Sequence, residues 1–316
     1  MRTELIDQPV MNQRIVRLMG NIFEIKILTE KSSEPEQFID AAIAEIRRIE
    51  ALLTTFDPRS QTNQVNANAG IRPIKVDREV FNLIERSIRI SELTQGAFDI
   101  SYGSLDKRFW NFDLSMKSLP DKETARTSVR LINYKNIFLD RAESTVFLKE
   151  KGMCIGFGGI GKGYAAEKAK QLLTGMGIES GIVNASGDLT AWGYQADGKR
   201  WTIGIVDPDT KIPFSFVDIT NMSVATSGNY EKYVTINGQR YSHTIDPRTG
   251  FPVTGIKSVT ILSPYAELSD AMATPIMVMG TKVGLNLINQ MKGIACIIVD
   301  DSNKIHHSKN LSVNHV

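Results

Sequence analysis

The stretch from residue 201 to 263 most limits the fold, because it has mainly the composition and alternation of β-strands. Within it, Asn237-Gly238 separates two short strand-like segments, and this dipeptide favours a two-residue type I′ hairpin turn. Strands joined by such turns pair antiparallel. The sequence therefore predicts an α+β fold, with a compact mixed, largely antiparallel sheet core and flanking helices.

Residues 36–56 and 78–94 carry the apolar spacing that is typical of amphipathic helices. The first helix is expected to end at Asp57-Pro58, since proline does not continue a helix. Asp77 is expected to cap the start of the second helix. Before both, the alternation of residues 14–29 predicts a strand or a hairpin near Met19-Gly20.

A glycine-rich loop, Gly158-Gly159-Ile160-Gly161-Lys162-Gly163, leads into a third helical segment that extends to about Met176. Unpaired N–H groups at a helix start, together with glycines that admit close approach, suit an anion and most often a phosphate. A tight turn before a helix is the alternative interpretation. Predicted strands at 145–148 and 181–184 flank the segment and suggest a local α/β unit.

Three further segments carry polar side chains next to predicted elements. Asp99 follows a helix end, where capping is a better explanation than ligand binding. Asn184-Ala185-Ser186-Gly187-Asp188 ends a short strand, a position common both to ligand clefts and to plain turns. In the segment 242–252, a histidine, an aspartate and an arginine lie within six positions of one another. The same segment contains two prolines and a glycine, which favour an ordered turn.

A last helix is expected to start at Leu268 to Thr274, with Ser269 or Asp270 near its N-terminus. Asp270 and Thr274 are one helical turn apart, so both side-chain oxygens point the same way. A carboxylate and a hydroxyl suit a hard cation. A capping aspartate and an ordinary helical threonine are the alternative.

The composition is ordinary for a soluble globular chain, and the net charge of +2 predicts no strong attraction to nucleic acid or an anionic membrane. The length of 316 residues suits one large domain or two fused lobes. No segment has the apolar length of a signal peptide or a membrane span. We therefore expect a cytoplasmic protein without stable membrane insertion, unless a leader has been removed. Cys154 and Cys296 are expected to be buried thiols, with a disulfide left open.

Taken in order, these segments resemble those of the flavin transferases that move FMN from FAD onto a protein threonine or serine, the family formerly called thiamine-biosynthesis lipoprotein ApbE. The resemblance runs from Met19-Gly20 to Gly280. Its most specific pieces are His-x-x-Asp-Pro-Arg-Thr-Gly and Thr-Ser-Gly-x-Tyr. The matching segments are Phe56-Asp57-Pro58-Arg59-Ser60 with Asn66, Gly96-Ala97-Phe98-Asp99-Ile100, Gly158 to Ala165, Asn184 to Asp188, Ala225 to Tyr230, His243 to Gly250, and Ser269 to Thr274.

The resemblance implies one flavin transferase domain over residues 1–316, with poorly patterned ends at 1–13 and 301–316 and two pseudo-repeated α/β halves. It also implies an FAD site and a Mg²⁺ site that consists of a loop carbonyl, a carboxylate and a hydroxyl. The implied FAD-binding residues are Met19, Phe56, Ala97, Phe98, Asp99, Lys162 and Thr244, and the implied metal-binding residues are Gly159, Asp270 and Thr274.

The implied activity is a Mg²⁺-dependent transfer of FMN from FAD onto a Thr or Ser hydroxyl of an acceptor flavoprotein, with release of AMP. His243 and Asp246 are the candidates for removing or relaying the hydroxyl proton, although Asp246 could instead only order its turn. Arg248 could contact phosphate or form a salt bridge within the turn. The same sites would also suit an FAD pyrophosphatase or a non-catalytic FAD-binding protein, so these two functions stay open.

Three positions depart from the family pattern. The family usually has an aspartate where this chain has Gly156, and that aspartate helps to hold the flavin nucleotide. Gly161 replaces an alanine of the loop. Pro275 follows Thr274 where a helix former is expected, and it removes an N–H bond to Ala271. If the alignment is right, Gly156→Asp tightens FAD binding.

Overall fold

The computed structural model describes residues 9–30, 34–106, 108, 118–207, 210, 212–228, 233–236, 239–311 and 314–315. Its centre is an eight-stranded sheet with the order β1-β2-β6-β7-β10-β13-β14-β15, in which all neighbouring strands are antiparallel. The predicted antiparallel α+β core is therefore confirmed. The strands are β1 (Val10–Leu18), β2 (Asn21–Thr29), β6 (Gly181–Ala185), β7 (Asp188–Trp192), β10 (Met222–Gly228), β13 (Ile256–Ser263), β14 (Ala295–Asp300) and β15 (Ile305–His307).

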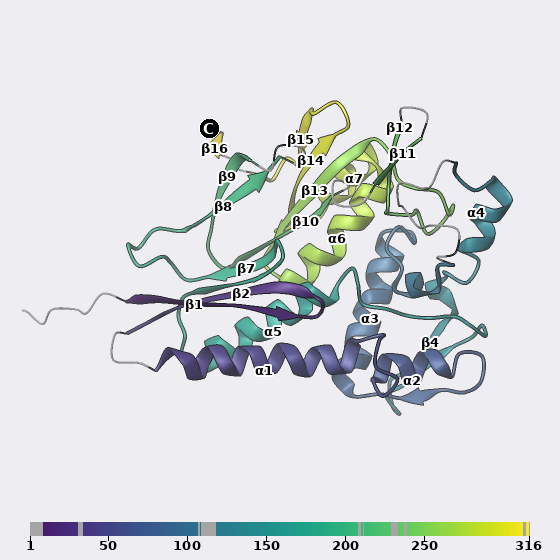
Figure 1. The fold of residues 1–316 in the computed structure, drawn as a ribbon, viewed down its shortest axis with the longest axis horizontal. Coiled ribbons are helices and arrows are strands. Elements are labelled where there is room, and N and C mark those ends of the chain that lie inside the picture. The colour runs from purple at the N-terminus through teal and green to yellow at the C-terminus, as the bar shows by residue number, and fades with distance from the viewer. Residues whose placement is uncertain are drawn as a thin grey trace, which may run out of the picture.

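Helices cover one face of this sheet, with α1 running along the β1–β2 hairpin and α5 and α6 across its middle (Figure 1). Alternate strand residues such as Phe23, Ile25 and Val259 are fully buried against these helices. Burial of such side chains stabilises the fold by roughly 1.5–3 kcal/mol each. The helices are α1 (Pro35–Leu53), α5 (Gly161–Gly175), α6 (Ala266–Met279) and α7 (Thr281–Ile288).

The opposite face of the sheet packs on a smaller sheet of order β16-β9-β8. Leu189, Val224 and Leu262 of the large sheet form a separate apolar cluster with Trp201 and Val217 of the small one. The central strands are therefore buried on both faces. The strands of the small sheet are β8 (Trp201–Val206), β9 (Pro213–Ile219) and β16 (Asn314–His315).

A second group of elements lies beside the end of α1, toward the right of Figure 1. It contains a three-stranded sheet of order β3-β5-β4. A separate hairpin of β11 (Tyr233–Ile236) and β12 (Gln239–Ser242) precedes residues 243–250, which form the histidine turn. The group consists of α2 (Gln61–Ala67), β3 (Ile74–Lys75), α3 (Arg78–Leu93), η1 (Ile100–Ser104), α4 (Lys122–Ser128), η3 (Tyr134–Asn136), β4 (Ile137–Asp140) and β5 (Thr145–Leu148).

The sequence placed the long helices and the first hairpin correctly. The predicted helices 36–56 and 78–94 are α1 and α3, and the hairpin turns at Met19-Gly20, where both residues have positive φ. The proposed turn at Asn237-Gly238 lies outside the described residues, but β11 and β12 pair on either side of it. The strand-like stretch from residue 201 to 263 corresponds to the strands β8 through β13.

Several local expectations were wrong. Asp77 does occupy the N-cap position of α3, but its side chain makes no capping hydrogen bond and instead accepts one from Gln61 at 2.6 Å. The strands around the glycine loop do not form one α/β unit, because β5 and β6 belong to different sheets. Helix α6 begins at Ala266, so Asp270 lies in its second turn rather than at its start. Pro275, in contrast, is a departure that the structure accommodates, since α6 continues past it to Met279.

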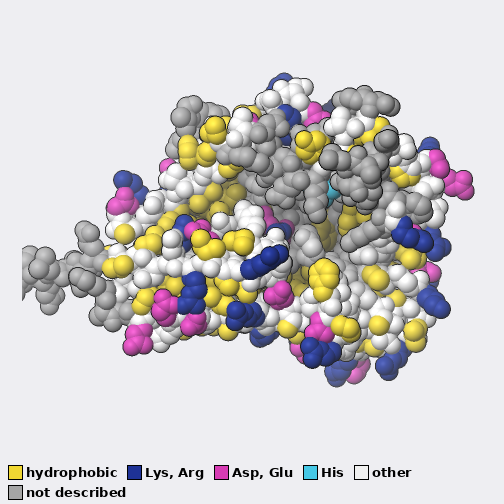
Figure 2. Space-filling view, viewed as in Figure 1, with side chains coloured by type: hydrophobic (Ala, Val, Ile, Leu, Met, Phe, Trp, Pro, Cys, Tyr) yellow, Lys and Arg dark blue, Asp and Glu magenta, His cyan; other side chains and the backbone are white. Residues whose placement is uncertain are grey.

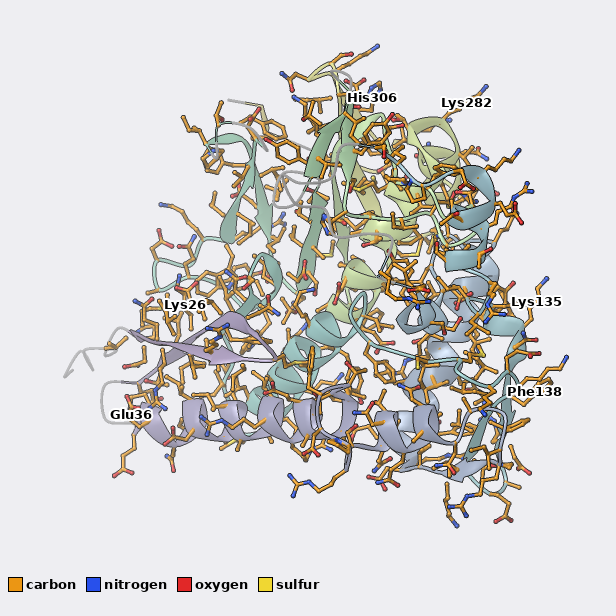
Figure 3. All side chains as sticks on the ribbon, turned by 45° about the vertical axis from the view of Figure 1, so that its right-hand side comes forward. Lys26, Glu36, Lys135, Phe138, Lys282 and His306 are labelled. Carbon is orange, nitrogen blue, oxygen red and sulfur yellow. The ribbon has the colours of Figure 1, made fainter. Side chains whose placement is uncertain are left out.

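The surface mixes charges of both signs. Lysine and arginine side chains alternate with aspartate and glutamate over the face in Figure 2, and the middle of this face is hollowed. The side chains labelled in Figure 3, including Lys26, Lys135 and Lys282, lie at the periphery of the molecule. No helix among the described residues has the length and apolar character needed to cross a membrane. Both cysteines are free thiols; Cys296 is buried, but Cys154 is only half-buried.

Candidate functional site

The start of α5 is packed directly against α6. A Cβ atom on Gly163 would lie 2.2 Å from the carbonyl oxygen of Ala266 and 2.7 Å from the Cβ of Asp270. Only glycine allows this approach without movement of the backbone. The contact lets the Gly163 N–H donate a 2.9 Å hydrogen bond to Oδ2 of Asp270. The α5 N-terminus thus fixes the orientation of the Asp270 carboxylate.

Lys162 lies between two carboxylates that come from different parts of the sheet–helix layer. Its Nζ is 2.7 Å from Oδ2 of Asp188, at the start of β7, and 3.6 Å from Oδ1 of Asp270. The side chains of the two aspartates are only 9% and 7% exposed. Two buried carboxylates therefore share one ammonium group, which leaves negative charge uncompensated at this position.

The pKa values reflect this imbalance. Burial and the nearby Asp270 carboxylate raise the pKa of Asp188 to about 7, against the opposing effect of Lys162. Burial lowers the pKa of Lys162, but the two carboxylates outweigh it and hold this pKa above its usual value. Lys162 is therefore a cation at neutral pH, and the cluster still lacks positive charge.

Two hydroxyl groups lie beside the carboxylates. Thr274 Oγ1, one helical turn after Asp270, is 3.2 Å from Oγ of Ser227 near the end of β10. The neighbouring Thr226 N–H donates to Oδ1 of Asp188 at 3.3 Å. The ends of β7 and β10 and the middle of α6 thus bring together carboxylate and hydroxyl oxygens, the ligand type of hard cations.

The described residues contain no group of three or more His, Cys, Asp or Glu side chains arranged to hold a metal ion. Magnesium does not require such a group, because it is often held by one or two carboxylates together with substrate phosphates. The side-chain oxygens of Asp270 and Thr274, together with the uncompensated negative charge beside them, suit a magnesium site of this kind. Gly159, the third expected ligand, is half-buried in the adjacent loop.

Two of the expected flavin-binding side chains lie against the glycine loop. A Cβ on Gly159 would be 3.5 Å from the Phe98 ring, and one on Gly161 would be 3.7 Å from Cε of Met19. Ala97 is buried next to Phe98. Phe56, in contrast, is 95% exposed, as suits an aromatic side chain available to a planar ligand.

Asp99 has its side-chain oxygens engaged by the protein. Oδ1 accepts hydrogen bonds from the N–H and the hydroxyl of Ser101, and Oδ2 accepts one from the N–H of Tyr134 at 2.8 Å. Burial raises the pKa of this carboxyl despite these bonds. Asp99 therefore caps η1, as its sequence context favoured, and it also orders the segment that carries Phe98.

The histidine turn is closed by its own pairing. Asp246 accepts two hydrogen bonds from the Arg248 guanidinium at 2.9 Å each, and a third from the Arg248 N–H. Arg248 thus forms the salt bridge within the turn rather than standing free. Thr244 is buried, with its N–H bonded to Oγ of Ser242, whereas His243 is exposed.

The turn also reaches the second group of elements. The N–H of Ile245 donates to the Tyr102 hydroxyl of η1 at 3.2 Å. Arg248 lies against Gly96, since a Cβ atom on Gly96 would be 3.8 Å from Cγ of Arg248. A hollow of about 360 Å³ opens where residues 95–99, residues 132–135 and the Pro247-Arg248 corner meet.

The sequence missed three members of this arrangement as site residues: Asp188, Ser227 and Gly163. A signal was present for each, since they lie in the segments 184–188, 225–230 and 158–163 that had been singled out. What the sequence could not give was their side-chain geometry. The pairing of Lys162 with Asp188 depends on the position of β7 beside α5.

A glycine loop, a buried lysine and two buried carboxylates meet where α5 and α6 cover the central strands of an antiparallel sheet, and the protein is of the α+β class. The model of the ApbE family matches residues 19–298, and the chain belongs to this family. It is 31% identical over 291 residues to an FAD:protein FMN transferase of Klebsiella pneumoniae (strain 342), covering 91% of this chain and 89% of that protein. It is 29% identical over 314 residues to the FAD:protein FMN transferase of Treponema pallidum (strain Nichols), covering 93% and 86%.

Solved structures agree in fold. The ApbE protein from Thermotoga maritima superposes with a TM-score of 0.85 at 29% identity, over 95% of this chain and 97% of that one. The flavinyl transferase ApbE of Pseudomonas stutzeri, in its apo form, gives a TM-score of 0.84 at 25% identity and covers 96% of both chains. The similarity therefore extends over nearly the whole chain.

Proposed function

We propose that this chain transfers the FMN part of FAD onto a threonine or serine hydroxyl of an acceptor protein, in the presence of Mg²⁺ and with release of AMP. The observation that carries the proposal is the Lys162 cluster, in which one ammonium group serves two buried carboxylates beside a glycine loop. A Mg²⁺ ion beside Asp270 would compensate the excess negative charge, and the FAD pyrophosphate would supply further oxygen ligands to that ion. Family membership over residues 19–298 supports the same function.

The reaction joins the acceptor oxygen to the FMN phosphorus and breaks the bond from that phosphorus to the oxygen of AMP. Asp270 and Thr274, with the Gly159 carbonyl, would hold Mg²⁺, which polarises the pyrophosphate and offsets the charge on the leaving phosphate. Lys162 would orient the nucleotide as a fixed cation, while Phe98, Met19 and Phe56 would contact the flavin part. The Asp188 carboxylate keeps Lys162 in place at 2.7 Å.

The proton of the acceptor hydroxyl needs a base. His243 is exposed at the turn, whereas Asp246 is occupied by three hydrogen bonds from Arg248. We therefore assign proton removal to His243 and the ordering of the turn to Asp246. An imidazole can accept a proton and pass it on, which suits such a step.

The test incubates the purified protein with FAD, MgCl₂ and a panel of threonine-containing acceptor proteins. We expect a fluorescent acceptor band that survives denaturing electrophoresis, with one AMP released for each FMN attached. Chelation of the divalent ion with EDTA removes both products, and excess MgCl₂ restores them. AMP and free FMN formed without any labelled acceptor would instead indicate a pyrophosphatase, and FAD recovered intact would indicate a binding protein.

A further inference from the structure

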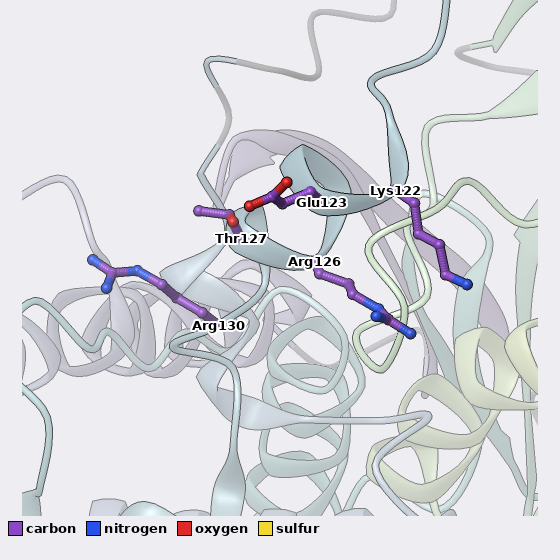
Figure 4. A pocket seen from close by; sticks show the side chains of 5 residues that line it. All are labelled: Lys122, Glu123, Arg126, Thr127 and Arg130. Carbon is purple, nitrogen blue, oxygen red and sulfur yellow. The ribbon is translucent and has the colours of Figure 1, made fainter.

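A basic hollow lies along α4, away from the Lys162 cluster. It has a volume of about 470 Å³ and is lined by Lys122, Glu123, Arg126, Thr127 and Arg130, all of which are exposed. Figure 4 shows Lys122 and Arg126 extending to one side of the helix and Arg130 to the other. Three cations and one carboxylate give the hollow a net positive charge.

These cations differ from most arginines of the molecule, which are paired. Arg59, Arg108 and Arg248 each bind the aspartate two residues before them. Lys122, Arg126 and Arg130 form no ion pair with any residue in the described part of the chain. Two nearby carboxylates are engaged elsewhere. Asp121 accepts the N–H groups of Glu123 and Thr124 at the start of α4. Asp106 binds Arg108, and Arg130 lies close enough to help lower the pKa of Asp106.

An unpaired basic helix face is by itself most often only solvated, but α4 is also fixed to the histidine turn. A Cβ on Gly250 would lie 2.0 Å from the carbonyl oxygen of Ala125, so the turn and the helix are in direct backbone contact. Ala125, Val129 and Ile245 form a small apolar cluster beneath this contact. The basic face therefore has a fixed position relative to His243.

We propose that the basic hollow lined by Lys122 and Arg126 of α4 and by Arg130, two residues after α4 ends, is the docking surface for an acidic segment of the acceptor protein. The proposal rests on the transfer function proposed above, in which a macromolecule must present one hydroxyl to the site. Charge complementarity of exposed residues speeds encounter and fixes register more than it adds affinity. A basic face rigidly joined to the turn would orient the acceptor for attack from the His243 side.

The experiment uses charge reversal with a matched control. The test variant is K122E/R126E/R130E, and the control is K292E/K304E/K309E, which reverses three exposed lysines around β14 and β15 and changes the net charge equally. The probes are two short fluorescein-labelled peptides with one central threonine, flanked in one by Asp and Glu and in the other by Asn and Gln. Fluorescence anisotropy gives peptide affinity, and flavin fluorescence quenching gives FAD affinity.

We expect the acidic peptide to bind the test variant at least about tenfold more weakly than the wild-type protein, with the control variant unchanged. The milder variant K122Q/R126Q/R130Q gives an intermediate loss. FAD affinity stays the same in all four proteins, which also shows that the variants are folded. Salt weakens binding of the acidic peptide to the wild-type protein but has little effect on the Asn/Gln peptide.

Equal affinity of the acidic peptide for the wild-type protein and the test variant, or equal weakening in both triple variants, overturns the docking surface. The proposed function fails in a different way, namely when no acceptor is labelled although FAD and the acidic peptide still bind. Labelling of acceptor proteins by the test variant with unchanged KM for the acceptor would likewise overturn the docking surface while leaving the transfer function intact.

Discussion

Two aspartate–cation arrangements in this molecule differ in charge balance. In the histidine turn, the Asp246 carboxylate pairs with the Arg248 guanidinium. Nε and Nη2 of Arg248 each donate a 2.9 Å hydrogen bond to an oxygen of Asp246. In the Lys162 cluster, one ammonium group lies between Asp188 and Asp270. The first arrangement is complete without a ligand. The second is not, and it is the one that lies at the glycine loop.

Exposure sharpens the contrast. The Arg248 side chain is 40% exposed, so its pair with Asp246 is partly screened by solvent and contributes little stability. The Lys162, Asp188 and Asp270 side chains are 24%, 9% and 7% exposed. Buried charges in excess lower stability unless a bound partner compensates them. Local pairs thus order a turn, whereas an unbalanced buried cluster indicates a binding site.

The largest expected effect is on Asp270. Asp270→Asn keeps an oxygen for the Gly163 N–H but removes the charge that would hold Mg²⁺, so the rate of FMN transfer falls by at least about a thousandfold. The rate is measured at saturating FAD with increasing MgCl₂. The control Asp197→Asn, at an exposed aspartate paired with Lys199, keeps full activity. A loss of less than tenfold would argue against Asp270 as a metal ligand.

The second effect concerns the packing that orients Asp270. Gly163→Ala forces a Cβ onto the Ala266 carbonyl oxygen at 2.2 Å, and we expect a loss of about 3 kcal/mol in the free energy of unfolding. Urea denaturation measures it. Gly175→Ala in the same helix meets no atom within 4 Å and is expected to be neutral or slightly stabilising. Equal stability of the two variants would contradict the close contact of α5 and α6.

The third effect separates the two candidates for the proton. His243→Ala lowers transfer by about a hundredfold, the usual contribution of a general base. Asp246→Asn lowers it by less than about tenfold, because that carboxylate only orders Arg248. The measurement is kcat for FMN transfer across pH. A hundredfold loss in Asp246→Asn with an unchanged His243→Ala variant would reverse the assignment.

The fourth effect is a pH dependence that belongs to the unbalanced cluster. The pKa of Asp188 is about 7 in the folded protein and near 4 in the unfolded chain, so the folded state binds the proton more tightly. Protonated Asp188 stabilises the folded protein fully below pH 4, and this stabilisation is lost as the pH rises toward 7. Relative to Asp188→Asn, the wild-type protein loses on the order of 3 kcal/mol over this range.

This pH effect is measured by urea denaturation in the presence of EDTA. Adding FAD and MgCl₂ is expected to abolish the difference, because the bound cation compensates the carboxylates. A wild-type protein that gains stability relative to Asp188→Asn as the pH rises would show that Asp188 is an ordinary ion pair.

The smallest effect is at Gly156. A Cβ there would be 3.8 Å from Cγ2 of Thr55, an ordinary contact, so the backbone accepts a side chain at this position. Gly156→Asp is expected to tighten FAD binding by about threefold through hydrogen bonds to the nucleotide. Gly175→Asp, at the far end of α5, adds the same charge and leaves the affinity unchanged. Identical FAD affinity in both variants would weaken the placement of the loop.

The sequence by itself determined most of the elements and the family. Apolar spacing located α1 and α3, alternation located the hairpin at Met19-Gly20, and the motif order implied the flavin transferase resemblance. These signals are local, since each depends on residues within a few turns or positions. The local roles of Asp99 and Asp246 were among the alternatives that the sequence suggested, because Ser101 and Arg248 each lie two residues further along the chain.

Only the tertiary structure decided which aspartates balance Lys162. Asp188 lies at the start of β7 and Asp270 within α6, and they meet because Gly163 lets α5 pack directly on α6. It also decided that Asp270 is in the second turn of its helix and that α4 is joined to the histidine turn. Burial and charge balance arise from segments far apart in the sequence, and a local pattern carries no information about them.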